Sequence, residues 1–438
     1  MSSHSRVILR LMSAIVCSTL SSQAGSDELN AQNSTADHAS AKLSPQLSFV
    51  IAWKGPDDGT WIHTFDDHHR AINPRPWSNS FQVQEDRGDP KIAVRHDGTS
   101  AAVWQKRDRN FRYSDIKARI YGADGNPKGS EITVITADTL NEISEFAIAA
   151  LSNGYLLLWT KGELILSRKL NSELQPISDN AHFNLKPGTN PKHLAIASFS
   201  DGGFILAWRT GDTNTCSRER NNTVFILTFN ASNEPIGQPT VIADYTNCGC
   251  HPAARRTGPE IAVLAQDKAV VTWRDGDGTL AETEEIMAHI VDRRARTVKK
   301  TFRVNELTRY RLEQDSSIAA LRDGGFVVTW TSLGIGRNGI GPELNTRSVI
   351  RGLRFDKNGN KVGREFVVNR SLRADQSAVA GLADGGFAVA WYGCVVDGND
   401  CELNFHAYGR DGESKTEGNV YPITRGGQPA INALPFLN

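Results

Sequence analysis

The strongest regularity in the chain is a short run of apolar residues that ends in tryptophan and recurs seven times. Its best-formed copy is DGGFVVTW at 323–330, and DGGFILAW at 201–208 and DGGFAVAW at 384–391 match it closely. Weaker copies end at Trp53, Trp104, Trp159 and Trp273. Successive copies are about 50 to 65 residues apart, and self-similarity at such a period is typical of a repeat architecture.

Each repeat contains four runs with the composition of short β-strands, most clearly in the sixth repeat, at Ser317–Leu321, Phe326–Trp330, Ser348–Phe355 and Glu365–Asn369. Asp-Gly between the first two runs predicts a two-residue type I′ turn, and Asn-Gly at 358–359 predicts a second tight turn. The second run is apolar at consecutive positions, which indicates a strand covered on both faces. Four antiparallel strands per repeat, stacked around an axis, describe a β-propeller blade.

The two ends of the chain hold complementary fragments of a blade. The first recognisable strand, Leu47–Trp53, is of the second type and has no first strand before it. The last, Gln428–Leu434, is a lone strand of the first type. We therefore predict an all-β, seven-bladed β-propeller with four antiparallel strands per blade, closed by pairing of the C-terminal strand with the N-terminal blade. Such closure hides sheet edges that would otherwise be exposed.

The sixth repeat also resembles a repeat of large secreted bacterial proteins, often found beside RTX-type calcium-binding segments. Leu321–Trp330 and Phe355–Asn369 carry the resemblance, which extends over roughly residues 47–438 and is sharp in repeats four, six and seven. It implies a β-propeller-like domain and no particular activity, and it transfers no functional residue to this chain.

Composition and the N-terminus indicate an exported protein. The formal net charge is +0, with 49 basic and 49 acidic residues, which argues against a nucleic-acid partner. A basic start, a short apolar run at 11–20 and a small-x-small site at 22–24 predict a signal peptide over residues 1–24. We expect a flexible leader at 25–45 and the propeller at 46–438, with no membrane span, in a secreted or periplasmic monomer.

Export permits disulfide bonds. Cys394 and Cys401 flank a turn-rich hairpin tip, and we predict that they form a local bridge. Cys216 is predicted to pair with Cys248 or with Cys250, and the choice between the two stays open. One thiol is left over in either case.

Two of the four connections in each repeat vary in length, and in a propeller they emerge on one face, where binding and catalysis usually occur. Arginine, histidine and tyrosine residues are frequent there, and a guanidinium is well shaped to bind carboxylates and sulfates. The candidate ligand-binding residues are Arg107, Arg218, Arg220, His251, Arg255, Arg274, Arg309, Tyr310 and Tyr392. The competing interpretation is that these are solvated charges paired with local acids, which the zero net charge favours.

No cofactor is expected apart from calcium. The clustered carboxylates Asp275, Asp277 and Glu282, with intervening glycines, are the candidate oxygen ligands, although the spacing is not that of a full calcium loop. The repeated tryptophans end buried-looking strands and are interpreted as core rather than as sugar-stacking platforms.

The leading interpretation from sequence is an exported, non-catalytic propeller that binds a glycan or protein ligand through its loop face. The alternative is a carbohydrate-active enzyme, a polysaccharide lyase or hydrolase acting on an acidic glycan at that face. A purely structural or adhesive module is the third. Ionisable groups that converge near the axis would favour the enzyme.

Overall fold

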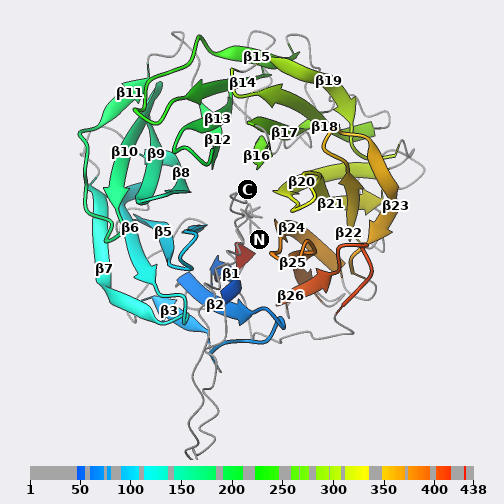
Figure 1. Ribbon diagram of the computed structural model, residues 1–438, viewed down its shortest axis with the longest axis horizontal. Helices are drawn as coiled ribbons and strands as arrows, with labels where there is room; N and C mark the ends of the chain where they lie inside the picture. The colour runs from blue at the N-terminus through cyan, green and yellow to red at the C-terminus, as the bar shows by residue number, and fades with distance from the viewer. Residues whose placement is uncertain are drawn as a thin grey trace, which may run out of the picture.

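The computed structural model describes residues 47–54, 60–73, 76–79, 90–107, 113–136, 143–183, 191–210, 222–245, 258–265, 267–275, 283–294, 296–306, 311–334, 348–369, 373–394, 401–415 and 429–430. Throughout these ranges the regular elements are β-strands. The strands form an all-β propeller in which the repeats follow one another around a ring in chain order (Figure 1). The fold class predicted from the repeat is therefore confirmed at this level.

The first four repeats each form a four-stranded sheet. Repeat 1 consists of β1 (Leu47–Lys54), β2 (Thr60–Asp66) and β3 (Trp77–Asn79), with β27 (Pro429–Ala430) as its fourth strand. Repeat 2 consists of β4 (Lys91–Val94), β5 (Ser100–Arg107), β6 (Tyr113–Tyr121) and β7 (Pro127–Thr136). Repeat 3 consists of β8 (Ile143–Leu151), β9 (Gly154–Lys161), β10 (Leu164–Asn171) and β11 (Ala181–Phe183). Repeat 4 consists of β12 (Lys192–Ser198), β13 (Phe204–Arg209), β14 (Asn222–Phe229) and β15 (Thr240–Tyr245).

The next two repeats share one eight-stranded sheet. Repeat 5 consists of β16 (Glu260–Leu264), β17 (Lys268–Asp275), β18 (Thr283–Asp292) and β19 (Thr297–Arg303). Repeat 6 consists of β20 (Arg311–Ala320), β21 (Phe326–Gly334), β22 (Val349–Phe355) and β23 (Lys361–Val367). Repeat 7 is the three-stranded sheet β24 (Arg373–Gly381), β25 (Phe387–Cys394) and β26 (Cys401–Tyr408).

The described strands thus form six hydrogen-bonded blades rather than the seven predicted. The difference arises between repeats 5 and 6, where β18 and β20 pair in parallel through Thr283 with Arg311 and Glu284 with Leu312. This short bridge, termed the β18–β20 bridge below, fuses two repeat units into one sheet. Sequence periodicity cannot reveal it, because it depends on hydrogen bonds between neighbouring repeats.

The last described strand, β27, lies against repeat 1. β27 pairs antiparallel with β1, with Ala430 opposite Ala52 and Pro429 opposite Trp53, and Figure 1 shows this short red strand beside β1 on the inner side of the ring. Repeat 1 also packs against repeat 7, because Phe405 of β26 lies 5.5 Å from Phe49 and 4.8 Å from Phe65 between ring centroids.

The core consists of buried clusters between successive repeats, which explains why the second strands are apolar on both faces. For example, Val328 and Trp330 of β21 pack on repeat 5, whereas Val327 on the opposite face packs on repeat 7. The tryptophan of every repeat is between 0% and 7% exposed. The prediction that these tryptophans are core residues is confirmed.

The Asp-Gly turns differ from the predicted type I′ turn. Gly324 has φ of 83°, but Asp323 is not among the residues with positive φ. Leu321 accepts a hydrogen bond from the Gly324 amide (2.9 Å) and donates to the Gly325 carbonyl (2.8 Å). This describes a longer loop in which one residue adopts the left-handed conformation. The second glycine, which the sequence motif also contains, therefore belongs to the turn.

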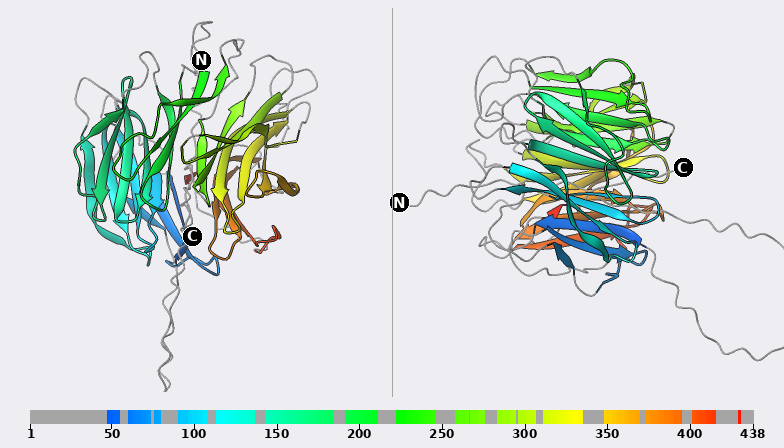
Figure 2. Two further views of the ribbon diagram at one scale, coloured as in Figure 1. Left: turned by 45° about the horizontal axis from the view of Figure 1, so that its top comes forward. Right: turned by 90° about the vertical axis from the view of Figure 1, so that its left-hand side faces the viewer.

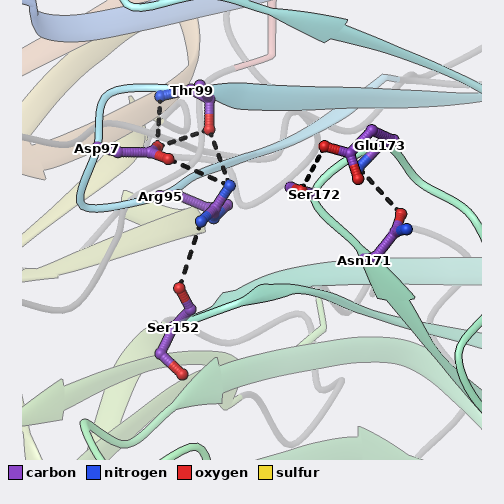
Figure 3. Close-up of polar contacts among 7 residues, drawn as sticks. All are labelled: Arg95, Asp97, Thr99, Ser152, Asn171, Ser172 and Glu173. Carbon is purple, nitrogen blue, oxygen red and sulfur yellow. Dashed lines mark hydrogen bonds and ion pairs between the residues drawn. The ribbon is translucent and has the colours of Figure 1, made fainter.

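Two ends of the ring are defined by the direction of the second strands (Figure 2). The Asp-Gly turns lie at the turn face, and the tryptophans lie toward the opposite end, the loop face, where the inner strands begin. At the turn face, polar side chains join neighbouring repeats. Arg95 donates to the carbonyl of Ser152 in repeat 3 (3.3 Å) while it pairs with Asp97 (3.2 Å) beside Thr99 (Figure 3). This leaves the loop face as the end with the variable connections.

Candidate functional site

The innermost strand of four repeats carries a β-bulge near its loop-face end. The pairing register shifts between Ile143 and Phe146 in β8, between Lys192 and Ala195 in β12, and at corresponding places in β20 and β24. In three of the bulges a non-glycine residue adopts positive φ: His193 (56°), Asp315 (52°) and Gln376 (54°). Bulges redirect side chains, and residues held in this sparsely populated region are concentrated at functional sites.

In repeats 2, 5 and 6 the residue that follows the repeated tryptophan contacts the bulged strand of the next repeat. Gln105 donates from Nε2 to the carbonyl of Ile143. Thr331 accepts through Oγ1 from the backbone amide of Gln376 at 2.9 Å. Arg274 donates from Nη1 to Oε1 of Gln314 at 3.4 Å. These contacts hold the loop-face ends of the inner strands at defined positions, which is the rigidity that a catalytic or binding site requires.

Glu145 and His193 form an acid–base pair across the junction of repeats 3 and 4. Both lie in bulges, and Nδ1 of His193 is 3.6 Å from Oε1 of Glu145. The imidazole is 6% exposed, whereas the Glu145 side chain is 22% exposed. A Cβ at Gly258 would lie 2.2 Å from Cβ of His193, so the backbone of repeat 5 passes directly against the histidine. The backbone at Gly258 thus restrains His193, whereas the Glu145 side chain stays partly accessible to solvent.

The backbone of Glu145 is fixed as well. Its amide donates to Oγ1 of Thr160 at 3.1 Å. The next residue, Phe146, has the Lys91 ammonium 5.9 Å from its ring centroid, a cation–π contact with repeat 2. A cation therefore lies near the carboxylate-bearing bulge, at the loop-face end of the neighbouring inner strand.

A second ionisable group lies between repeats 5 and 6. Glu313 of β20 is 2% exposed, and burial raises its pKa to about 7. Ser332 donates a hydrogen bond to the carboxylate, and the nearby Arg351 acts in the same direction, so both oppose the rise in pKa. A carboxyl group that titrates near neutrality is uncommon in proteins and is a marker of functional sites.

Few of the site residues predicted from sequence lie in the described part of the chain. Arg274 of β17 is 4% exposed, so it is a buried junction residue and not a loop charge. Tyr392 of β25 is half-buried, and burial raises its pKa. Arg107 ends β5 and Asp275 ends β17. Arg274 and Tyr392 come from repeats 5 and 7, with repeat 6 between them in the chain order of the ring.

The remaining predicted residues lie outside the described ranges: Arg218, Arg220, His251, Arg255, Arg309, Tyr310, Asp277, Glu282, Cys216, Cys248 and Cys250. Calcium binding and the bridge from Cys216 stay predictions. Cys394 and Cys401 are direct backbone partners across the β25–β26 hairpin, a placement compatible with the predicted disulfide.

The sequence prediction placed the functional residues in loops, whereas the carboxylates and the histidine described above lie on inner strands. Glu145, His193 and Glu313 lie within strands, and the first two come directly before an apolar run. A polar residue at the start of an inner strand, repeated in several copies, was the available signal.

Among the residues with described side chains, Asp66, Asp67 and His68 could hold a metal ion, with ligand atoms within 4.8 Å of one another. They form the turn after β2, at the turn face. Oδ1 of Asp66 already accepts from the amides of His68 (2.9 Å) and Arg70 (2.8 Å). The carboxylate therefore stabilises a turn, and the cluster is away from the loop face.

No family model matches the chain, and no curated protein is similar to it. Among solved structures, the chain is similar to an α-L-arabinofuranosidase from Fusarium graminearum (12% identity, 70% of this chain and 88% of that chain, TM-score 0.43). It is also similar to an α-L-arabinanase from Penicillium chrysogenum (11%, 72% and 92%, TM-score 0.43) and to a Hadza microbial sialidase (10%, 77% and 71%, TM-score 0.44).

These neighbours are enzymes named for activity on glycans. The leading interpretation from sequence, a non-catalytic binding propeller, is therefore corrected, and its alternative is taken up as a proposal below. At these identities and TM-scores the likeness concerns the fold, so the activity proposed below is argued from the residues of this chain. In the described ranges we find no helix with the length and apolarity needed to cross a membrane.

Proposed function

We propose that this chain is a carbohydrate-active enzyme, a polysaccharide lyase or hydrolase, whose active site lies at the loop face. The observation that carries the proposal is the Glu145–His193 pair. Carboxylates and imidazoles are the side chains most often used in general acid–base catalysis. Their 3.6 Å separation is longer than a hydrogen bond, as is common in enzymes without substrate.

The pair can serve either reaction. In elimination, His193 would take the proton beside the carboxylate of a uronic acid, the carbon–carbon double bond would form as the glycosidic bond breaks, and the resulting imidazolium would return a proton to the departing glycosidic oxygen. In hydrolysis, Glu145 would donate a proton to the glycosidic oxygen, and water would add to the anomeric carbon. Hydrolysis requires a second carboxyl group. Asp315 and Glu260, both half-buried at the loop-face ends of inner strands, are the described candidates.

Cations near this pair support an acidic glycan as substrate. Lys91 and Lys192 begin the inner strands on either side of β8, which carries Glu145. Lys91 is 8% exposed, so most of this residue is buried. A cation in such a position interacts more strongly with a substrate carboxylate than a solvated lysine does, because screening is weaker.

The test is incubation of the purified full chain with neutral and acidic polysaccharides. A rise in ultraviolet absorbance would report elimination, and new reducing ends without that rise would report hydrolysis. We expect Glu145→Gln and His193→Asn each to lower kcat/KM at least about hundredfold. Asn is chosen because it tolerates the positive φ of this position.

Gln376→Asn is the matched control, since Gln376 occupies the corresponding bulge of repeat 7 with φ of 54°. It should retain activity and a similar melting temperature. No product across the panel, or full activity in both variants of the pair, would refute the proposal.

The complete architecture also belongs to this proposal. The β27–β1 pairing and the contacts of Phe405 with Phe49 and Phe65 support a ring of seven repeats closed at the chain ends. Residues 1–24 are proposed to be a signal peptide that directs export, which suits an enzyme acting on extracellular glycans. A disulfide between Cys394 and Cys401, which are backbone partners, is proposed as well, because export permits disulfide bonds.

A further inference from the structure

The junction of repeats 5 and 6 differs from the other described junctions because two sheets are hydrogen-bonded there. The β18–β20 bridge consists of only two residue pairs, Thr283 with Arg311 and Glu284 with Leu312. Glu313 follows immediately in β20 and is 2% exposed. A buried carboxyl group thus lies at the end of a short and isolated stretch of pairing.

Glu313 faces repeat 5. It lies opposite Ser332 in the β20–β21 register, and Val328 and Trp330, on the same face of β21, pack on repeat 5. The Oε2 atom of Glu313 has no hydrogen-bond partner, although it is buried. A buried carboxyl with an unsatisfied oxygen is tolerated when protonated and costly when ionised.

The charged groups around Glu313 do not neutralise it. Arg351 of β22 favours ionisation of Glu313, but it is committed to Glu365 of β23, with Nη1 3.3 Å from Oε2. Two carboxyl groups therefore share one guanidinium, and Glu365 acts against ionisation of Glu313. Arg311 of β20 acts weakly in the opposite direction. From repeat 5, Arg274 of β17 reaches the adjacent Gln314.

Glu365 cannot easily turn away to accommodate a second negative charge. Its Oε1 accepts from the backbone amide of Glu306, in the connection between repeats 5 and 6. The Glu365 side chain in its ion pair with Arg351 is 8% exposed. An additional charge at Glu313 would therefore be relieved most readily by admitting water between the two repeats.

We propose that Glu313 makes the junction of repeats 5 and 6 a pH-operated joint. With the carboxyl protonated, the β18–β20 bridge is closed. With it ionised, the bridge opens and water reaches the carboxylate, while the rest of each sheet stays intact. The inference does not depend on the proposed enzyme activity.

Hydrogen exchange measured on the full chain across a pH series tests the joint, with rates corrected for the intrinsic pH dependence of exchange. Opening transfers Glu313 from a site with pKa about 7 to water, where its ordinary value is 4.5. We expect the protection of the bridge amides at 283–284 and 311–312 to fall roughly thirtyfold between about pH 5 and pH 7, and to change little above that. Amides at 376–379, at the junction of repeats 6 and 7, should show no such step.

Two variants distinguish opening of the β18–β20 bridge through Glu313 from a pH-dependent loss of protection throughout the protein. Glu313→Gln should abolish the pH step and keep the bridge protected throughout the series. Glu365→Gln frees Arg351 for Glu313, and the step should move to lower pH. Persistence of the step in Glu313→Gln, an identical step at 376–379, or protection in the native chain that does not vary with pH would each overturn the proposal.

Discussion

The two glycines of the Asp-Gly-Gly motif perform different tasks, and exchanging each for alanine should separate them. Gly324 has φ of 83°, but a Cβ there would only touch Cβ of Lys357 at 3.7 Å. A Cβ on Gly325, whose φ is unremarkable, would lie 2.3 Å from the carbonyl oxygen of Phe355. That oxygen belongs to β22, directly across from β21, and cannot move without shifting a strand.

The expected costs follow from these contacts. Gly324→Ala should lower the free energy of unfolding by about 1 to 2 kcal/mol, the cost of a left-handed conformation for an L-residue. Gly325→Ala adds volume to a tightly packed place, at about 1 to 3 kcal/mol, and weakens sheet hydrogen bonds worth about 1 kcal/mol each. We therefore expect Gly325→Ala to cost about 3 kcal/mol, more than the substitution at the glycine with positive φ.

Urea unfolding of the full chain, followed by tryptophan fluorescence, measures both values. Gly386→Ala provides an internal replicate, since its Cβ would lie 2.1 Å from the carbonyl oxygen of Tyr408. A larger loss of stability for Gly324→Ala than for Gly325→Ala would refute this reasoning. It would show that positive φ costs more than the close approach of β22 to Gly325.

Three further predictions concern the core, the closure and the buried acid. Trp330→Ala should lower the free energy of unfolding by about 3 to 5 kcal/mol, as measured in urea, because the side chain is fully buried between repeats. Deleting the residues after Arg425 removes β27 and should lower the melting temperature, whereas an unchanged value would contradict closure of the ring. Because the pKa of Glu313 is raised to about 7 from 4.5, its stabilising contribution is complete below about pH 4.5 and is lost as the pH rises through 7. The stability of Glu313→Gln relative to the native chain should therefore grow by about 3 kcal/mol across that window in a series of urea titrations, and a constant difference would refute the assignment.

Much of the fold could be predicted because each repeat is marked by short sequence patterns, namely apolar strands and glycine-containing turns. FVVTW and its copies are apolar at consecutive positions, and such a strand needs cover on both faces, which stacked blades provide. The tight turns were located correctly by Asp-Gly and Asn-Gly. The turn geometry was not, since it depends on the hydrogen bond from the Gly324 amide to the Leu321 carbonyl and on that from the Leu321 amide to the Gly325 carbonyl.

The site was less predictable, because its groups meet across repeats. Glu145 and His193 are 48 residues apart in numbering and become neighbours only when repeats 3 and 4 stack. Arg274 reads as a loop charge in the sequence, yet it is buried by its contact with Gln314 of the next repeat. Residue type alone could not distinguish a solvated charge from a buried one.

The sequence by itself therefore determined the strand content, the number of repeats and the buried tryptophans, because each follows from spacing and hydrophobicity within about 50 residues. Only the tertiary structure decided that repeats 5 and 6 share a sheet, that Glu313 is withdrawn from water, and that Glu145 faces His193. These features depend on how one repeat lies against the next. Burial, pairing and pKa are properties of that junction and not of either repeat alone.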